Sequence, residues 1–251
     1  MYFRPALLFV CTLMLILFAD SSARSEDQPQ QADAPKKFSL EFTGKSQVII
    51  PKLRYDGVEP ITLEAWVKPY AHDADNIRAS VVANLQLAGV GIHYSGERWM
   101  AHFNEGRASN AGYVSTASNA EADIDQPVHV AAVYDGLSFK LFVNGKQQDY
   151  VGQTTLPHVP SPYDFMVGAD PNGKGKPHQF FKGVIDEVRI SKVARYTKDF
   201  KPAKRFKPDK ETLVLYHFDE GTGKIAHDAS GNKHHGAIQG ANWVKQITDE
   251  K

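Results

Sequence analysis

The sequence predicts an all-β protein in which two antiparallel sheets form a jelly-roll sandwich, and three observations support this fold class. From Phe38 onward, apolar residues recur at every second position in about ten short segments, which is the period of strands with one buried face. Turn residues separate these segments, and the pair Asn144-Gly145 follows one of them where a hairpin turn is expected. Only the segment at 193–200 has the pattern of a helical turn. Short strands without intervening helices indicate a sandwich rather than an α/β fold.

Each predicted strand has its apolar residues on one face. In the segment at 61–67, the side chain of Trp66 points away from the apolar side chains beside it. In the segment at 183–191, an uninterrupted alternation puts Glu187 and Arg189 on one face, where each is expected to pair with the other or with a neighbouring strand. The other predicted strands show the same alternation and lie at 38–42, 79–85, 89–94, 98–103, 128–135, 139–145, 164–169 and 212–218.

The N-terminus has the pattern of a cleaved export signal. Arg4 precedes an apolar run that is shorter than the roughly 20 residues needed to span a bilayer. Ser21 and Ala23 are small residues at the minus-three and minus-one positions of a cleavage before Arg24. We expect the mature protein in the periplasm, at the cell surface or outside the cell. The expected divisions are a signal peptide at 1–23, a linker without regular structure at 24–37 and one domain at 38–245.

Composition excludes several classes of function. The chain has 251 residues, and 29 Lys and Arg balance 29 Asp and Glu, so the formal net charge is zero. This balance excludes a basic surface over the whole protein, so neither nucleic acid nor membrane insertion after signal cleavage is expected. The one cysteine, Cys11, lies within the signal, which excludes disulfides, thiolate zinc sites and cysteine nucleophiles from the mature protein.

Four segments carry motifs that are specific in combination, namely FSLEFTGKSQVIIP with ITLEAWVKP, VHVAAVYDGLSFKLFVNGKQ, FFKGVIDEVRISKVARYTKDF and LYHFDEGTGKIAHDASGNKHHGAI. In this order they resemble the laminin-G-like, or concanavalin A-like, jelly-roll family found in bacterial exported proteins. The resemblance covers nearly everything after Lys37 and implies the sandwich fold. The same family includes binding domains, adhesion modules and enzyme appendages, so the function has to be argued from sites.

The end of the chain is expected to complete the fold. In a jelly roll the first and last strands are neighbours, because closure of the sheets removes exposed edges. The segment HGAIQGANWV is therefore predicted to form a strand beside the first one, with Trp243 packed onto it. If Trp243 is fully buried there, replacing it with Ala should cost about 3–5 kcal/mol.

Four aromatic residues near expected loop boundaries are candidates for stacking on a sugar ring. Trp66 either forms a platform on the concave sheet or packs beneath a loop. Tyr70, Trp99 and Tyr113 are the other three candidates. With the export signal and the resemblance, they favour a secreted, non-catalytic module that binds an extracellular glycan or a protein partner.

A catalytic function is the main alternative. Glu121, Asp123 and Asp125 follow one another at every second position, and a retaining glycosidase needs two carboxyl groups about 5 Å apart. The final glutamate of the motif in laminarinase-type enzymes is missing, and Pro127 argues against a central strand, so a solvated loop is expected. A polysaccharide hydrolase or lyase stays open as the alternative, as does a passive structural or assembly module.

The sequence requires no cofactor, although two loops carry oxygen ligands suited to a structural Ca²⁺. Asp73 and Asp75 lie in a loop that Pro69 precedes. Asp228 and Asn232 lie in a second loop near the end of the chain, where their side chains would either bind Ca²⁺ or form turns that bend the chain.

Overall fold

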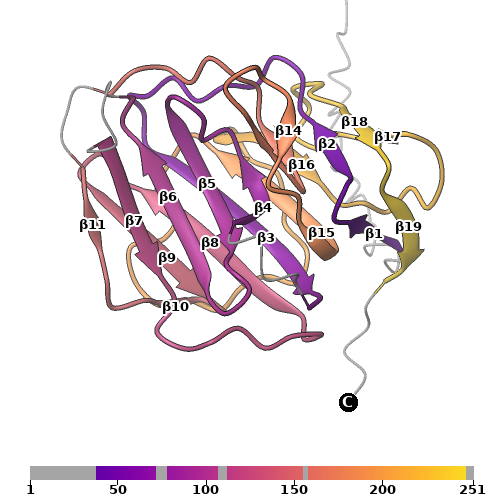
Figure 1. The fold of residues 1–251 in the computed structure, drawn as a ribbon, viewed down its shortest axis with the longest axis horizontal. Coiled ribbons are helices and arrows are strands. Elements are labelled where there is room, and N and C mark those ends of the chain that lie inside the picture. Colours follow the sequence, from indigo (N-terminus) through magenta and orange to yellow (C-terminus); the bar gives the residue numbers. More distant parts are fainter. Residues whose placement is uncertain (1–37, 72–77, 107–111, 155–157, 247–251) are drawn as a thin grey trace, which may run out of the picture. The chain divides into compact units, whose positions relative to one another are not determined.

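The computed structural model describes residues 38–71, 78–106, 112–154 and 158–246. These residues form strands, turns and loops arranged as two large antiparallel sheets, as the sequence predicts (Figure 1). None of them belongs to a helix that is long and apolar enough to cross a membrane. The expected signal peptide and linker lie outside the described residues.

Sheet A contains nine strands. They are β1 (Phe38–Thr43), β3 (Ile61–Pro69), β8 (Val128–Tyr134), β9 (Ser138–Val143), β10 (Lys146–Gln147), β11 (Gly152–Gln153), β15 (Lys182–Ser191), β16 (Thr212–Tyr216) and β19 (Asn242–Lys245). Their order across the sheet is β10-β9-β8-β3-β15-β1-β19, while β11 pairs with β9 and β16 pairs with β15.

Sheet B contains eight strands in the order β17-β18-β2-β12-β4-β5-β6-β7. They are β2 (Gln47–Ile49), β4 (Ala79–Ala83), β5 (Gly89–Tyr94), β6 (Trp99–Asn104), β7 (Tyr113–Ala117), β12 (Met166–Val167), β17 (Ile225–Ala226) and β18 (Gly236–Gln239). A separate hairpin consists of β13 (Asp170–Pro171) and β14 (Pro177–His178).

The core lies between the two sheets and is rich in aromatic residues. On β3, Leu63 and Ala65 point into the core and are fully buried, in agreement with the predicted alternation. Phe103 of sheet B contacts the ring of Tyr134 of sheet A, with ring centroids 4.6 Å apart. Contacts of this kind join the two layers and remove large aromatic surfaces from water, which is the main stabilising term for such a sandwich.

The last strands close both sheets, as expected. Strand β19 pairs with β1, so that Trp243 lies opposite Leu40, while β18 pairs with β2 in sheet B. Figure 1 shows β1 and β19 side by side. The indole N–H of Trp243 donates a hydrogen bond of 3.0 Å to the carbonyl of Gly223, and its ring contacts Phe218. Trp243 is only half-buried, which lowers the stabilisation expected from it.

Two local predictions are wrong. Residues 193–200 form bends and irregular backbone rather than a helical turn. The aromatic side chains of this segment pack against the outer face of sheet A. In β15 the register shifts between Ile185 and Val188, so that both side chains enter the core despite their odd spacing. A bulge of this kind inserts one residue and breaks the alternation.

Removal of residues 232–251 should prevent cooperative folding, because it deletes β18 and β19 and exposes an edge in each sheet.

Replacement of Trp243 with Ala should lower the free energy of unfolding by about 1–3 kcal/mol, which is less than the loss expected for a fully buried Trp. Circular dichroism melts of the two variants and the full chain provide the measurement. A truncated chain that melts cooperatively within a few degrees of the full chain would contradict this account.

Candidate functional site

The outer face of sheet A, which points away from the core, is covered by residues 192–211, here called the strap. Tyr196 and Phe200 of the strap stack with ring centroids 3.5 Å apart and lie against Phe142 of β9. Phe206 is 2% exposed and packs against the ring of His129. The strap thus fills the outer face of sheet A with its own aromatic side chains.

Trp66 lies beneath the strap. Its indole N–H donates a hydrogen bond of 2.8 Å to the carbonyl of Ala203, and its ring meets the ring of His129 edge to face at 5.5 Å. Of the two interpretations of Trp66, packing beneath a loop describes the observed side chain.

Glu64 of β3 is fully buried under the same strap and forms the centre of a polar network. Its carboxylate accepts a hydrogen bond of 2.8 Å from Nε of Arg189 and another of 2.8 Å from the hydroxyl of Tyr196, and it lies 3.2 Å from Nε2 of His129. Burial by itself raises the pKa of this carboxyl, but the contacts with His129, Arg189 and Tyr196 outweigh burial, so the pKa is lowered. Glu64 is therefore ionised at neutral pH and joins the strap to the sheet.

A second buried carboxylate, that of Glu187 on β15, repeats this arrangement nearby. It accepts a hydrogen bond of 3.0 Å from the amide of Phe206, and its two oxygens each lie 2.9 Å from Nδ1 of His217. Arg189 thus pairs with the neighbouring strand β3, which is one of the two pairings expected from the sequence. Glu187 instead contacts the strap and His217, which directly follows β16.

The segment that follows the hairpin of β13 and β14 lies alongside β4 of sheet B. The amide of Ser80 on β4 donates a hydrogen bond of 2.8 Å to the carbonyl of Gln179, just after β14. Beside this contact, the buried rings of His93 and His102 meet at 5.1 Å. Burial lowers the pKa of His102 to about 4 and holds the pKa of His93 well below its ordinary value. Both imidazoles are therefore neutral at pH 7.

The other aromatic candidates do not converge on one site. Trp99 is 1% exposed and belongs to the core, so its ring is not available as a stacking platform. Tyr113 lies on β7 of sheet B, with the guanidinium of Arg78 5.8 Å above its ring. The hydroxyl of Tyr70, which follows β3, donates a hydrogen bond of 3.1 Å to Glu41. These residues are thus spread over the core and two different sheets.

A cavity of about 200 Å³ opens at the rim of the sandwich, at the end where β10 lies in Figure 1. It lies between residues 118–128, which connect β7 to β8, and residues 143–148 around the turn from β9 to β10. We call it the rim pocket. Trp99, Val128 and Val143 are among the apolar residues that line it. Its polar side chains come from Asn119, Glu121, Asp123, Gln126, Asn144 and Gln148.

Hydrogen bonds hold the wall of the rim pocket in place. The guanidinium of Arg98 donates to the carbonyls of Ser118 and Asn119, at 3.0 and 2.6 Å. The amide of Asn119 donates to the side-chain oxygen of Gln148 at 2.8 Å. Neither Asn119 nor Gln148 was singled out from the sequence, because polar residues are common in loops and this contact joins positions 29 residues apart.

The three carboxylates considered for catalysis take different places at this rim. Glu121 and Asp123 are exposed and line the pocket, whereas Asp125 does not line it and has a φ of 59°. The amide of Asp125 donates a hydrogen bond of 2.9 Å to the carbonyl of Pro69. The segment is a turn-rich loop, as expected, and it does not present the carboxylates along one strand face.

Comparison with protein families gives a match over residues 42–199 to the family described as the concanavalin A-like lectin/glucanases superfamily. The chain belongs to this superfamily. The superfamily match covers the strands from β1 to β15 and the first part of the strap. A search of proteins with curated functions gives no match.

Comparison with solved structures gives one that shares the fold of this superfamily member and others with lower similarity. A candidate carbohydrate binding protein from Bacteroides ovatus is 15% identical, with a TM-score of 0.65 over 85% of this chain and 61% of that chain. A SAP-like pentraxin from Limulus polyphemus is 13% identical, with a TM-score of 0.49 over 66% of this chain and 81% of that chain. Domains LG4-5 of the mouse laminin alpha1 chain are 13% identical, with a TM-score of 0.49 over 68% and 48% of the two chains. This superfamily member thus spans about three fifths of the Bacteroides ovatus protein.

Asp228, an expected Ca²⁺ ligand of this concanavalin A-like domain, is occupied by hydrogen bonds. Its Oδ1 accepts hydrogen bonds from the amides of Leu215 and Ser230, and its Oδ2 accepts them from the hydroxyl of Ser230 and the amide of His234, at 2.8–3.0 Å. The side chain of Asn232 donates to the carbonyl of Thr212 at 2.8 Å. Asp228 bends the chain as a turn former through its contact with the amide of Ser230, which is the second of the two roles proposed from the sequence. Asn232 instead joins this loop to β16.

The other two expected Ca²⁺ ligands, Asp73 and Asp75, lie outside the described residues. Within the described ranges, no group of three or more His, Cys, Asp or Glu side chains is placed to hold a metal ion. A structural Ca²⁺ at residues 73–75 stays a prediction.

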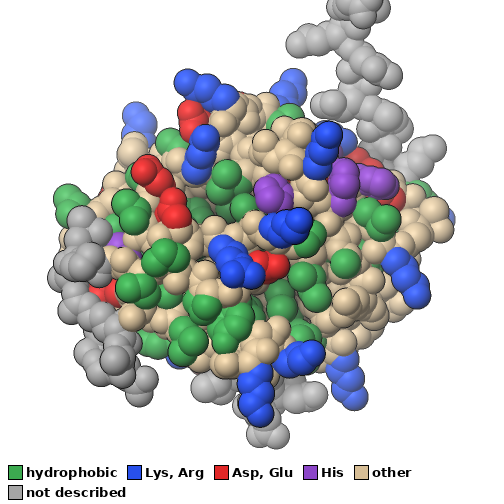
Figure 2. All heavy atoms as spheres, turned by 90° about the horizontal axis from the view of Figure 1, so that it is seen from above, with side chains coloured by type: hydrophobic (Ala, Val, Ile, Leu, Met, Phe, Trp, Pro, Cys, Tyr) green, Lys and Arg blue, Asp and Glu red, His purple; other side chains and the backbone are tan. Residues whose placement is uncertain are grey.

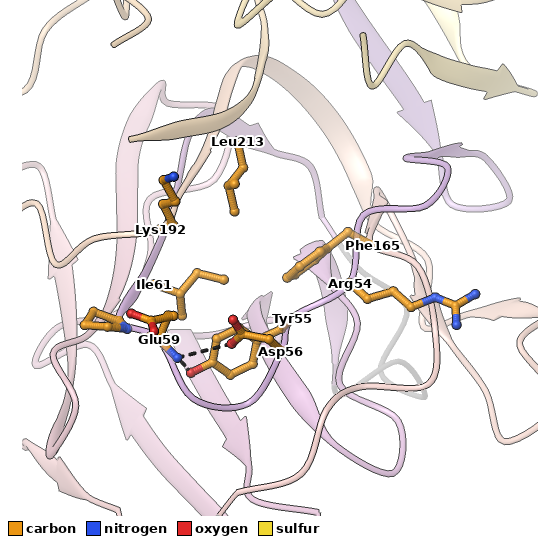
Figure 3. Close-up of a pocket in the computed structure, with 9 residues that line it drawn as sticks. Arg54, Tyr55, Asp56, Glu59, Ile61, Phe165, Lys192 and Leu213 are labelled. Atoms are coloured by element: carbon orange, nitrogen blue, oxygen red, sulfur yellow. Dashed lines mark hydrogen bonds between the residues drawn. The ribbon is translucent and has the colours of Figure 1, made fainter. Parts of the chain in front are cut away.

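A second cavity lies between the start of β3 and β16 and has a volume of about 40 Å³. Figure 3 shows Ile61, Phe165 and Leu213 pointing into it, while Arg54 points away. The hydroxyl of Tyr55 donates a hydrogen bond of 2.7 Å to the carbonyl of Glu59 at its edge. A space of this size holds at most a few water molecules, so the rim pocket is the better candidate for a ligand.

Asp170 of β13 makes the stability of the superfamily member depend on pH. It is 2% exposed, and burial raises the pKa of its carboxyl to about 7, against the effects of the Leu85 amide and the charge of Arg78. An unfolded Asp has a pKa of about 3.9, so between about pH 4 and pH 7 the folded state binds a proton that the unfolded chain has lost. The contribution of Asp170 to the free energy of unfolding therefore falls as pH rises through this window.

Replacement of Asp170 with Asn keeps an acceptor for the Leu85 amide and removes the buried charge. The variant should be more stable than the unchanged protein at pH 8, by a few kcal/mol at most, and the difference should shrink towards pH 5. Urea denaturation at several pH values measures this difference. Asp125→Asn makes the same substitution at an exposed position and is the control. A difference for Asp170→Asn that stays constant from pH 8 to pH 5 would contradict the assignment.

Proposed function

We propose that this protein is an exported, non-catalytic binding module that holds a single sugar ring of an extracellular glycan in the rim pocket. The observation that carries the proposal is a cavity of about 200 Å³ whose wall combines apolar surface with carboxylate and amide side chains. Such side chains hydrogen-bond the hydroxyl groups of a sugar, while the apolar wall contacts its C–H groups.

The size of the rim pocket supports a small ligand. Pockets for drug-sized molecules have volumes of about 300–1,000 Å³, so about 200 Å³ fits one ring rather than several. Because Arg98 and Gln148 hold the wall in place, little ordering is needed when a ligand binds. The terminal residue of a glycan chain is therefore a better ligand than an internal segment that must lie across a long groove.

The exposure of the carboxylates favours binding over hydrolysis. A glycosidase acid usually needs a carboxyl whose pKa is raised by an apolar surrounding. Glu121 and Asp123 are exposed to solvent at the rim, where no such surrounding encloses them. They are suited to accept hydrogen bonds from a ligand, and a hydrolase stays the alternative that the experiment below distinguishes.

Replacement of Asp123 with Asn should weaken binding to the glycans that the unchanged protein selects on a glycan array by about tenfold or more, because a hydrogen bond to a charged acceptor contributes about 1.5–3 kcal/mol. Asp125→Asn is the matched control, since it makes the same change in the same loop outside the pocket lining. It should bind as the unchanged protein does. Equal binding by both variants, or no glycan bound by the unchanged protein, would contradict the proposal.

The same proteins should be incubated with a panel of polysaccharides and assayed for new reducing ends and unsaturated products. We expect no turnover above that of a heat-treated sample. Turnover that Glu121→Gln abolishes would show a hydrolase or lyase instead. A protein that binds neither glycans nor proteins in pull-down experiments would be a passive structural module.

A further inference from the structure

The strap carries a row of lysines at three-residue intervals, although the whole chain has zero net charge. All of them are exposed. Figure 2 shows one face of the domain, where Lys and Arg side chains are more frequent than Asp and Glu; the lysines of the strap are not labelled in this view. The row consists of Lys198, Lys201, Lys204, Lys207 and Lys210.

The fold explains why these lysines lie on one side of the strap. Phe200 and Phe206 point towards sheet A, and the carbonyl of Ala203 between them accepts the hydrogen bond from Trp66. Positions 200, 203 and 206 thus contact the sheet at intervals of three. Phe200 and Phe206 make these contacts with their rings, and Ala203 makes its contact with its carbonyl. The lysines stand at the positions between these contacts, and all of them are exposed.

Two of the three acidic residues of the strap, Asp199 and Asp209, are directed away from this row, and the third, Glu211, lies 3.7 Å from Nζ of Lys210. Asp199 accepts hydrogen bonds from Nζ of Lys146, at 2.9 Å, and from the amide of Gln147, at 3.0 Å, both on β10. Asp209 accepts two from the guanidinium of Arg195, at 2.7 and 2.8 Å, and this contact lowers the pKa of its carboxyl. Asp199 and Asp209 are thus directed to partners outside the row, and Lys198, Lys201 and Lys207 keep the outer side of the strap positively charged.

We propose that the outer side of the strap binds a linear polysaccharide that carries sulfate or carboxylate groups. Lysine ammonium groups act as point charges on flexible stems, so a row of them suits an anion repeated along a polymer rather than one ligand of fixed shape. The row also begins next to the rim pocket, because the amide of Phe200 donates a hydrogen bond of 2.9 Å to the carbonyl of Gly145, and Asn144 lines the pocket. The strap would bind such a polymer whether or not the pocket holds its end.

The surroundings of the lysines favour a polysaccharide over a membrane or nucleic acid. Membrane-surface segments combine basic residues with exposed apolar side chains that enter the lipid, and single-stranded nucleic acids stack on exposed aromatic rings. The large aromatic side chains of the strap, Tyr196, Phe200 and Phe206, are turned towards sheet A. In the described residues, none of the strongly exposed large apolar side chains lies within 192–211.

The test measures binding of the full chain to dextran sulfate and to polygalacturonate, with uncharged dextran as the polymer control. One variant replaces three lysines of the strap with Gln, namely Lys198, Lys201 and Lys207. The control variant replaces three exposed lysines outside the strap with Gln, namely Lys45, Lys174 and Lys176. We expect binding to at least one charged polymer, weakened by added salt, and no binding to dextran. The strap variant should bind about tenfold or more weakly, while the control variant should be unchanged.

Thermal melts should show equal stability of the two triple variants, because every changed side chain is exposed. The comparison of dextran sulfate with polygalacturonate identifies the preferred anion. Equal binding by both triple variants would overturn the proposal. So would tighter binding of phosphatidylserine vesicles or of DNA through the same lysines, because the partner would then be a membrane or a nucleic acid. The Asp123→Asn variant should still bind the charged polymer, which separates this proposal from that of the rim pocket.

Discussion

The buried carboxylate of Glu64 is the constraint on which the arrangement of the functional surfaces depends. A charge at this depth is tolerated only because Arg189, His129 and Tyr196 all contact it. Tyr196 belongs to the strap, so satisfying Glu64 requires the strap to lie across sheet A. The polar network and the aromatic packing therefore favour the same closed arrangement.

Closure of sheet A determines which surfaces remain for binding. A sandwich of this family could present an open sheet face, but here the strap covers the outer face of sheet A. The rim pocket and the outer side of the strap both stay accessible. The strap thus has two functions in this account: its aromatic side chains stabilise the sheet, and its lysines face the solvent.

Alternation of apolar residues was sufficient to predict most long strands, because each has one face in the core. It also placed Trp66 on the outer face of β3 correctly. It failed at β15, where a bulge changes the phase, and at residues 193–200, whose aromatic spacing resembles a helix but serves contacts with sheet A. A local sequence pattern carries no information about contacts with residues that lie far away in the sequence.

The candidate site was less predictable than the fold for the same reason. The acidic loop at 121–125 was recognised as notable, but its relation to Asn144 and Gln148 comes from the pairing of β8 and β9. Trp99 lies in the core, where its ring packs against that of Tyr94, and its place near a loop boundary could not indicate this. Residue type suggested the chemistry, whereas tertiary pairing decided which residues meet.

The most direct measurement of the central claim is the stability of Glu64→Gln together with the protease sensitivity of the strap. Glutamine is nearly the same size but leaves Arg189 buried without its counter-charge, so the free energy of unfolding should fall by about 3–5 kcal/mol. Limited trypsin digestion, followed by mass spectrometry, should show faster cleavage within 192–211 than in the unchanged protein. A variant that melts within about a degree of the unchanged protein and keeps its strap equally protected would contradict the claim that Glu64 holds the strap in place.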